Sequence, residues 1–226
     1  MSPRIERADA PVNGVTRGED PMPSSSPTVP TAAYTTLIAS LWPSKGGGAA
    51  LMRAAALAFL GTVLLTVSAK IQVPGPVPMT LQTLVVLLIG AAYGWRLGGA
   101  TVALYLVEGA WGLPVFAGPV AGIGYMAGPT GGFLMGFLAA AMVTGLMAER
   151  GWDRSLGRVL AMMAGGHAVI FVFGLAWLAP MFQFDFGRAW AAGVAPFYAA
   201  TVLKTALAAA LMQAGWMMVA RREAQG

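Results

Sequence analysis

Lys204, Glu108 and His167 are ionisable side chains that lie well inside the long apolar stretches of this sequence. An ionised group in the centre of a hydrophobic segment costs about 2.5 to 3.5 kcal/mol on insertion scales, and such groups are usually paired or functional. Lys204 lies near the middle of an apolar run between residues 191 and 220, far from either end. Its type and position predict a site where an ammonium group binds the anionic part of a ligand.

Other roles for Lys204 remain open. Buried charges are usually paired, and Glu108 is the one acidic residue deep in an apolar stretch, so the two could form a structural ion pair. In a second alternative the long side chain snorkels and carries its charge to the membrane surface. In a third, a proton-coupled secondary carrier of a small organic anion would use Glu108 and Lys204 as a relay.

Catalytic and metal-binding signatures are missing from these 226 residues. There is no HExxH motif, no GxSxG motif and no carboxylate pair in one apolar stretch, so we expect no metal, no cofactor and no catalytic residue, and an intramembrane enzyme is the weakest alternative. His167 has no cysteine, aspartate or glutamate beside it, so it cannot complete a site of three or four metal ligands. A P-loop is also missing, and a partner would have to hydrolyse any ATP.

The apolar stretches are long enough to form membrane helices. The chain is 57% hydrophobic and only 10% charged, whereas soluble proteins carry about 25% charged residues. A helix needs about 20 apolar residues to cross a hydrocarbon core of about 30 Å. Two stretches are shorter and contain glycine, so we expect loop or re-entrant backbone to complete them. The six predicted spans of this all-α integral membrane protein are residues 49–69, 80–92, 97–113, 130–148, 156–179 and 191–220.

Lysine and arginine residues near the span ends predict the orientation. With the N-terminus inside, seven arginines lie on the inner side, against only Lys70 and Arg188 on the outer side. Both termini are therefore expected in the cytoplasm, and the loops 70–79, 114–129 and 180–190 outside. The basic residues form no stripe with interleaved aromatic residues, so nucleic acid is not an expected partner.

Residues 1–48 differ from the rest of the chain. They contain seven of the 15 prolines and no long apolar run, so they are expected to form a disordered cytoplasmic tail before a transmembrane domain of residues 49–226. Five apolar residues in this tail recur at helical spacing and predict a short helix on the membrane surface over residues 34–42, with an unstructured segment as the alternative. These five are Tyr34, Leu37, Ile38, Leu41 and Trp42.

Four motifs then resemble, in order, the BioY family of biotin-binding S components of energy-coupling factor (ECF) transporters. They are Pro78-Met-Thr-Leu-Gln-Thr83, Tyr105 through Gly-Ala-Trp-Gly-Leu-Pro-Val-Phe-Ala-Gly118, Ala127-Gly-Pro-Thr-Gly-Gly-Phe-Leu-Met-Gly-Phe137, and Pro196-Phe-Tyr-Ala-Ala-Thr-Val-Leu-Lys204. The resemblance covers about residues 50–220 and leaves out the N-terminal tail.

This resemblance implies the S-component fold of six transmembrane helices in a bacterial-type plasma membrane, and capture of biotin from the outer side. The implied partners are membrane lipid, an ECF coupling transmembrane protein and two ATPase subunits. Small residues at Ala54 and Ala58 resemble the motif that docks on the coupling protein, since a row of small residues lets another helix approach closely. A second such row is Gly128, Gly132 and Gly136.

The resemblance also implies a biotin pocket under the loop 113–128 and at the start of the next helix. Lys204 matches the lysine of the family's D-x-x-K element, but Thr201 replaces its aspartate. Biotin has an apolar ring and chain, a ureido group and a carboxylate, and a pocket for it should be apolar and aromatic with a few polar groups. Lys204 is expected to bind the carboxylate or the ureido carbonyl, with Glu108 or Thr201 as acceptor for a ureido N–H. The expected ligand-binding residues are Phe116, Gly124, Tyr125, Gly128, Thr130, Gly131, Phe133, Thr201, Lys204 and Glu108.

Overall fold

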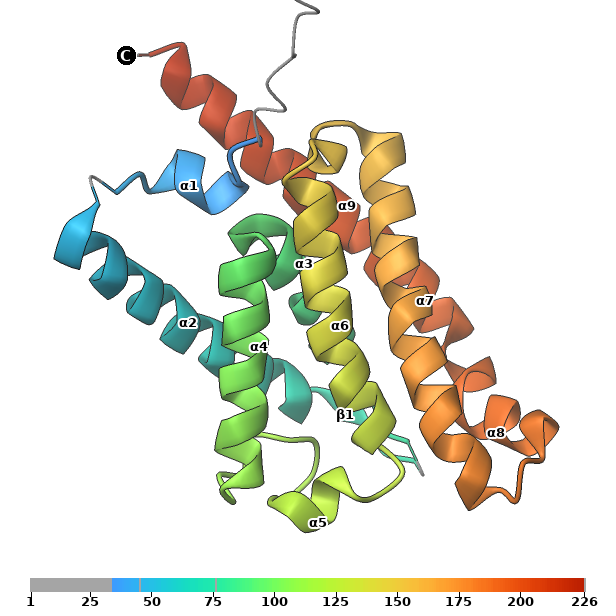
Figure 1. Ribbon diagram of the computed structural model, residues 1–226. Coiled ribbons are helices and arrows are strands. Elements are labelled where there is room, and N and C mark those ends of the chain that lie inside the picture. Colours follow the sequence, from blue (N-terminus) through green and yellow to red (C-terminus); the bar gives the residue numbers. More distant parts are fainter. Residues whose placement is uncertain (1–33, 45, 76, 226) are drawn as a thin grey trace, which may run out of the picture. The chain divides into compact units, whose positions relative to one another are not determined.

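The computed structural model describes residues 34–44, 46–75 and 77–225, which form a helical bundle (Figure 1). Most of the expected disordered tail, residues 1–33, lies outside the described residues. Each of the six apolar stretches contains a helix of 12 to 26 residues within this part of the chain, although the helix of the stretch 191–220 begins only at Tyr198. These helices are α2 (Gly47–Lys70), α3 (Gln82–Tyr93), α4 (Trp95–Ala110), α6 (Gly131–Ala148), α7 (Leu156–Met181) and α9 (Tyr198–Glu223).

Shorter elements connect these helices. A two-stranded antiparallel hairpin precedes α3 and pairs Gln72 with Thr80. The short elements are α1 (Leu37–Leu41), β1 (Gln72–Val73), β2 (Met79–Thr80), α5 (Ile123–Met126), η1 (Trp152–Arg154), α8 (Phe186–Gly193) and η2 (Ala195–Phe197). Helix α1 falls within the range 34–42, but its position on a membrane surface stays a prediction.

Among the residues that the structure describes, four helical segments are long and apolar enough to cross a membrane: α2, α6, α7 and the segment Phe186–Glu223 that contains α8 and α9. Helices α3 and α4 have 12 and 16 residues and are too short to cross alone. The hairpin lies before α3, and the loop that contains α5 lies after α4. The described part of the chain therefore contains four candidate membrane spans, and the full set of six stays a prediction.

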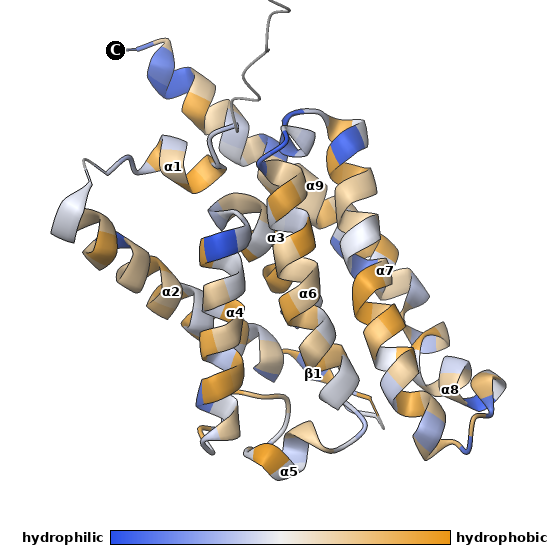
Figure 2. Cartoon of the chain, in the orientation of Figure 1, coloured by the Kyte–Doolittle hydropathy of each residue, from blue (hydrophilic) through white to orange (hydrophobic). Residues whose placement is uncertain are grey.

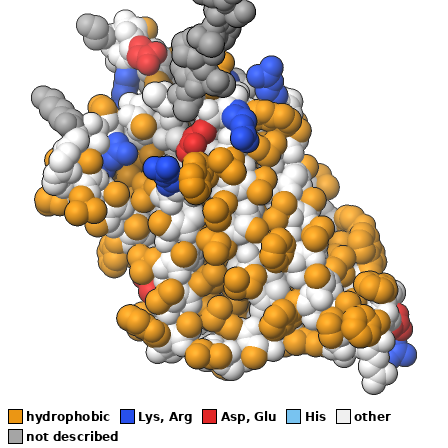
Figure 3. Space-filling model, in the orientation of Figure 1, with side chains coloured by type: hydrophobic (Ala, Val, Ile, Leu, Met, Phe, Trp, Pro, Cys, Tyr) orange, Lys and Arg blue, Asp and Glu red, His pale blue; other side chains and the backbone are white. Residues whose placement is uncertain are grey.

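Side-chain polarity along the helices agrees with a membrane protein. The helices are mostly apolar, with hydrophilic residues near their ends (Figure 2). Apolar side chains cover most of the visible surface, and most of the visible lysine and arginine residues gather near one end (Figure 3). Many large apolar side chains are exposed, among them Phe59, Val172 and Val202, which are 67, 64 and 70% exposed. Exposed apolar surface of this extent is typical of helices that face lipid.

Helix α6 lies at the centre and packs against α3, α4 and α7. Glycine makes these contacts possible, because a Cβ atom at Gly136 would lie 3.0 Å from the Cα of Ile170 in α7. A Cβ at Gly132 would likewise collide with Trp177 of α7. Gly132 and Gly136 of the predicted glycine row thus serve helix packing inside the chain, whereas Gly128 lies before α6, where a Cβ atom would approach only backbone carbonyls of α5.

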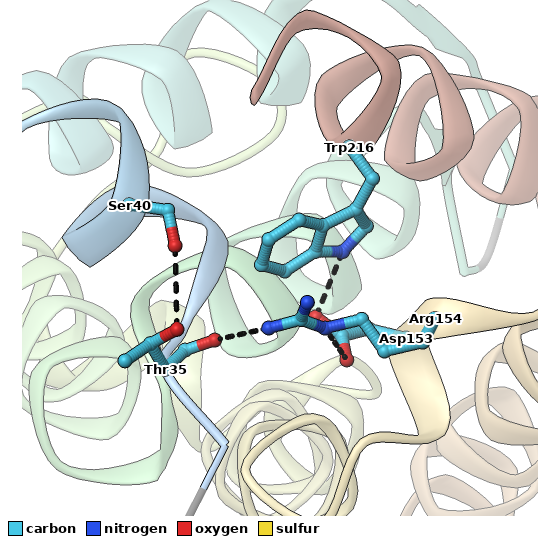
Figure 4. Close-up of polar contacts among 5 residues, drawn as sticks. All are labelled: Thr35, Ser40, Asp153, Arg154 and Trp216. Carbon is cyan, nitrogen blue, oxygen red and sulfur yellow. Dashed lines mark hydrogen bonds and ion pairs between the residues drawn. The ribbon is translucent and has the colours of Figure 1, made fainter. Parts of the chain in front are cut away.

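A polar cluster joins the segment before α1 to α9 and η1 at the predicted cytoplasmic end (Figure 4). The guanidinium of Arg154 lies 3.5 Å from the centre of the Trp216 ring and donates a hydrogen bond to the Thr35 carbonyl (3.0 Å). Trp216 Nε1 donates to Asp153 Oδ2 (2.9 Å). Burial raises the pKa of the Asp153 carboxyl above its ordinary value, while the charge of Arg154 and the Trp216 hydrogen bond lower it. The cluster therefore holds three distant segments together.

Candidate ligand-binding site

A cavity lies at the opposite end from this cluster, between α3, α6, α7 and α9 and beneath the loops that follow β1 and α4. Its lining is mostly apolar and aromatic, with one charged group. The lining residues are Val77, Pro78, Thr80, Gln82, Thr83, Ala117, Tyr125, Thr130, Phe133, Leu134, Phe137, Ile170, Phe171, Phe197, Thr201 and Lys204. The cavity volume of about 40 Å³ holds only a few water molecules, so the lining must move apart to admit a larger ligand.

Lys204 is the charged group of this cavity and is only 7% exposed. Its ammonium donates hydrogen bonds to the Thr80 carbonyl (2.6 Å) and to Thr83 Oγ1 (3.1 Å). Helix α9 packs against α3, and this packing brings Lys204 to the start of α3. The structure contains no ion pair with Glu108, since Lys204 bonds to the threonines instead. Snorkelling to the membrane surface is also wrong, because the ammonium stays inside the bundle.

Hydroxyl and amide side chains are the other polar groups that line the cavity. Thr130, 8% exposed, lines the cavity, and its buried Oγ1 has no hydrogen-bond partner among the described residues. Gln82 Nε2 donates to the Tyr105 hydroxyl (2.7 Å), and Thr80 Oγ1 lies 3.0 Å from Gln82 Oε1. Thr201 stands one helical turn before Lys204 and lines the same cavity. The cavity can therefore present one cation, several hydroxyl groups and an apolar surround to a ligand.

Aromatic rings support the loop above the cavity. Phe116 stacks on Tyr125 with ring centres 5.1 Å apart and meets Tyr105 edge-on at 5.5 Å. Phe116 fits because Gly109 has no side chain, since a Cβ there would overlap the Phe116 ring. Tyr105 then donates a hydrogen bond to the Val115 carbonyl (2.8 Å). These contacts fix the position of Tyr125.

Lys70 at the end of α2 fastens the same loop. Its ammonium donates hydrogen bonds to the carbonyls of Phe116 (2.7 Å) and Gly118 (2.9 Å). Since two carbonyls of one loop converge on a single cation, Lys70 limits how far this loop can move away from the cavity.

Five of the ten expected ligand-binding residues line the cavity: Tyr125, Thr130, Phe133, Thr201 and Lys204. The other five do not reach its lining. Phe116 is completely buried behind Tyr125, and Glu108 is half-buried on α4. Gly124 lies in α5, Gly128 lies in the turn after it, and Gly131 begins α6 and donates through its N–H to the Gly128 carbonyl (3.1 Å). They shape the loop that carries Tyr125 and Thr130.

The sequence did not indicate which residues surround Lys204, nor which aromatic residues complete the wall of the cavity. Thr80, Gln82 and Thr83 belong to the motif of residues 78–83. This motif supports the family resemblance, but it does not indicate what these three side chains contact. The rings of Phe171 and Phe197 pack edge to face, with their centres 6.2 Å apart. In the sequence, only their apolar character distinguishes these two residues. His167 is 2% exposed, and its Nδ1 lies 3.0 Å from the Met163 carbonyl, as expected of a packing residue.

The sequence profile of the BioY family matches residues 35–221. This chain belongs to the BioY family. Its relatives include the probable biotin transporter BioY of Pyrococcus horikoshii, 39% identical over 67% of this chain and 89% of the relative. The biotin transporter BioY of Thermotoga maritima is 38% identical over 70% of this chain and 92% of the relative. The BioY match covers α2, α3, α4, α6 and α7 completely and α9 except for its last two residues.

A solved structure shares the BioY fold seen here. The crystal structure of the S-component for biotin from an ECF-type ABC transporter matches 80% of this chain and 96% of its own, with a TM-score of 0.66 and 20% identity. The likeness supports the arrangement of the helices alone.

Proposed function

We propose that this protein takes up biotin, capturing it from the outer side in the cavity around Lys204 as the substrate-binding component of an ECF transporter. One observation carries the proposal: a single cation and several hydroxyl groups stand in an otherwise apolar and aromatic cavity. Biotin has the matching parts, because its ring and chain are apolar while its ureido group and carboxylate are polar. The named relatives are biotin transporters, which favours transport over enzymatic turnover.

The residues of the cavity suggest how biotin is held. Lys204 would donate to the carboxylate or the ureido carbonyl, giving up part of its bonding to Thr80 and Thr83. Thr201 and Thr130 would accept the ureido N–H groups. Glu108 is outside the lining and is not proposed as a contact. Tyr125 and Phe133 would cover the apolar parts of the ligand.

We further propose that the chain crosses the plasma membrane six times, with both termini on the cytoplasmic side. Residues 1–48 would form a cytoplasmic tail, and α1 would lie on the inner surface of the membrane. The arginine distribution supports this orientation. The chain contains no native cysteine, so single cysteines at Ser155 and Gly187 can test it. A membrane-impermeant maleimide should label position 187 in intact cells and position 155 only after permeabilisation. The reverse pattern would refute the orientation.

Helix α2 is the proposed docking face for an ECF coupling protein with its two ATPase subunits. Ala54 and Ala58 are half-buried, while Leu51 and Met52 on the same half of the helix are 72 and 75% exposed. The C-terminal half of α2 packs against α4 through Gly61, where a Cβ atom would collide with Thr101. The N-terminal half of α2 therefore presents small and apolar side chains that a helix of another protein could pack against.

A calorimetric titration tests the proposed ligand. Purified protein should bind biotin at one site per chain with a nanomolar dissociation constant, equivalent to about 12 kcal/mol. Desthiobiotin and a vitamin without a ureido ring serve as comparison ligands. Absence of heat with biotin together with saturation by another vitamin would refute the proposal.

The loop contact of Lys70 gives a second binding prediction. Lys70→Met should weaken biotin binding about fivefold, because the loss of hydrogen bonds that restrain the loop is worth about 1 kcal/mol. Dissociation of biotin should become faster, since the loop opens more readily. Arg188→Met is the matched control, as Arg188 is also an exposed cation of the outer loops but bonds to Asp185 (3.2 Å). Equal affinities for the wild type and Lys70→Met would show that the contact does not restrain the loop.

A further inference from the structure

A second hollow lies on the outside of the bundle, between α7 and α9, next to α8. Its volume is about 570 Å³, and we call it the α7–α9 groove. Three alanines open it: Ala164 and Ala168 from α7 and Ala206 from α9, all exposed. Valine, leucine and phenylalanine side chains form most of the remaining wall. The α7–α9 groove can therefore take a long apolar group.

The α7–α9 groove has few polar side chains, and two of them contact each other. Thr205 Oγ1 lies 3.3 Å from His167 Nδ1. Trp190 and Tyr198 stand next to each other at the α8 end, with ring centres 6.0 Å apart. Tryptophan and tyrosine are enriched where a membrane protein meets the lipid headgroups. The α7–α9 groove thus begins at an aromatic pair and extends along α7 as far as Leu160 and along α9 as far as Ala206.

The docking face and the α7–α9 groove lie on different sides of the bundle. Helix α2 packs against α3 and α4, whereas α7 packs against α6, α8 and α9, and Figure 1 shows α4 and α6 between α2 and α7. A coupling protein on Ala54 and Ala58 would leave the α7–α9 groove free. Both walls belong to segments long and apolar enough to cross a membrane, so the surrounding medium of this groove is the bilayer.

We propose that the α7–α9 groove binds one acyl chain of a membrane phospholipid. The size, the apolar wall and the aromatic pair at the headgroup level fit a lipid chain that enters from the outer leaflet. Phe171 and Thr201 line both this groove and the ligand cavity. An acyl chain in the groove would therefore contact Phe171 and Thr201 on one side, while the ligand in the cavity would contact both residues on the other side. Lipid and ligand binding are linked through this shared wall, and such coupling is reciprocal.

Native mass spectrometry of detergent-purified protein supplied with dioleoylphosphatidylglycerol tests the proposal. The wild type should retain one phospholipid per chain. Ala168→Phe and Ala206→Phe, each of which fills the groove, should lower the retained fraction at least tenfold. Ala55→Phe is the matched control, because Ala55 is an exposed alanine on α2, and it should retain lipid as the wild type does. Two groove variants are used so that one still decides the question if the other does not fold, as judged by its melting curve.

Lipid retention is measured without biotin, so this test does not depend on the proposed ligand, and three results would overturn the proposal. The wild type could retain no phospholipid, or the groove variants could retain as much as the wild type. Alternatively, the wild type could be a dimer without bound lipid that Ala168→Phe converts to a monomer, which would make the groove a contact between two copies.

Discussion

Lys204→Met is expected to weaken biotin binding by about tenfold to over a hundredfold. Methionine keeps the length and apolar stem of the side chain but removes the charge, and a hydrogen bond to a charged group is worth about 1.5 to 3 kcal/mol. Each 1.4 kcal/mol changes the dissociation constant tenfold. The effect should be large because the ammonium is the only cation among the residues that line the cavity. Isothermal titration with biotin measures it.

Two controls separate a ligand role of Lys204 from a structural one. Leu207→Met changes a residue of α9, 43% exposed, that lines neither the cavity nor the α7–α9 groove, and it should bind biotin as the wild type does. Glu108→Gln should change neither affinity nor melting temperature, and it should not rescue Lys204→Met, since the two residues form no ion pair. Full binding by Lys204→Met together with a lowered melting temperature would show that Lys204 only holds the start of α3 in place.

Ala58→Trp and Ala54→Trp are expected to abolish ATP-driven biotin uptake while biotin affinity stays within twofold of the wild type. An indole group on this face would keep a partner helix at a distance, whereas small residues allow close packing. The cavity lies among other helices and contains no residue of α2. Uptake of labelled biotin by cells that express the complete transporter should fall at least tenfold.

Ala55→Trp is the matched control for this face, because it places the same side chain one residue along α2, at an exposed position. Uptake by Ala55→Trp should remain close to that of the wild type. Loss of biotin binding in Ala54→Trp or Ala58→Trp would instead show that these residues support the fold. Equal loss of uptake in all three variants would show that docking does not depend on the small residues.

The positions of the long helices could be predicted from the sequence, because apolar length and turn residues are local properties. Six apolar stretches became six helices, and the glycine interruptions correctly indicated that α3 and α4 are short. Hydropathy could not reveal the hairpin before α3, since two strands of two residues depend on contacts with the bundle.

Only part of the site could be predicted, for a physical reason. Lys204 is visible because a charge in an apolar run is costly, and Thr201 is indicated only by the resemblance, since it occupies the aspartate position of the D-x-x-K element. The choice of partner for Lys204 depends on which helix lies opposite: α3 does, so Thr80 and Thr83 accept its hydrogen bonds instead of Glu108. Phe116 was assigned to the ligand because it is aromatic and belongs to the right motif, but it stands behind Tyr125 as a support.

A structure of the protein with biotin bound tests the central claim most directly. We expect biotin in the cavity between α3, α6, α7 and α9, with a carboxylate or ureido oxygen within hydrogen-bond distance of Lys204 Nζ and with Tyr125 and Phe133 against its apolar parts. Biotin at another place, with Lys204 still bonded only to Thr80 and Thr83, would contradict the account.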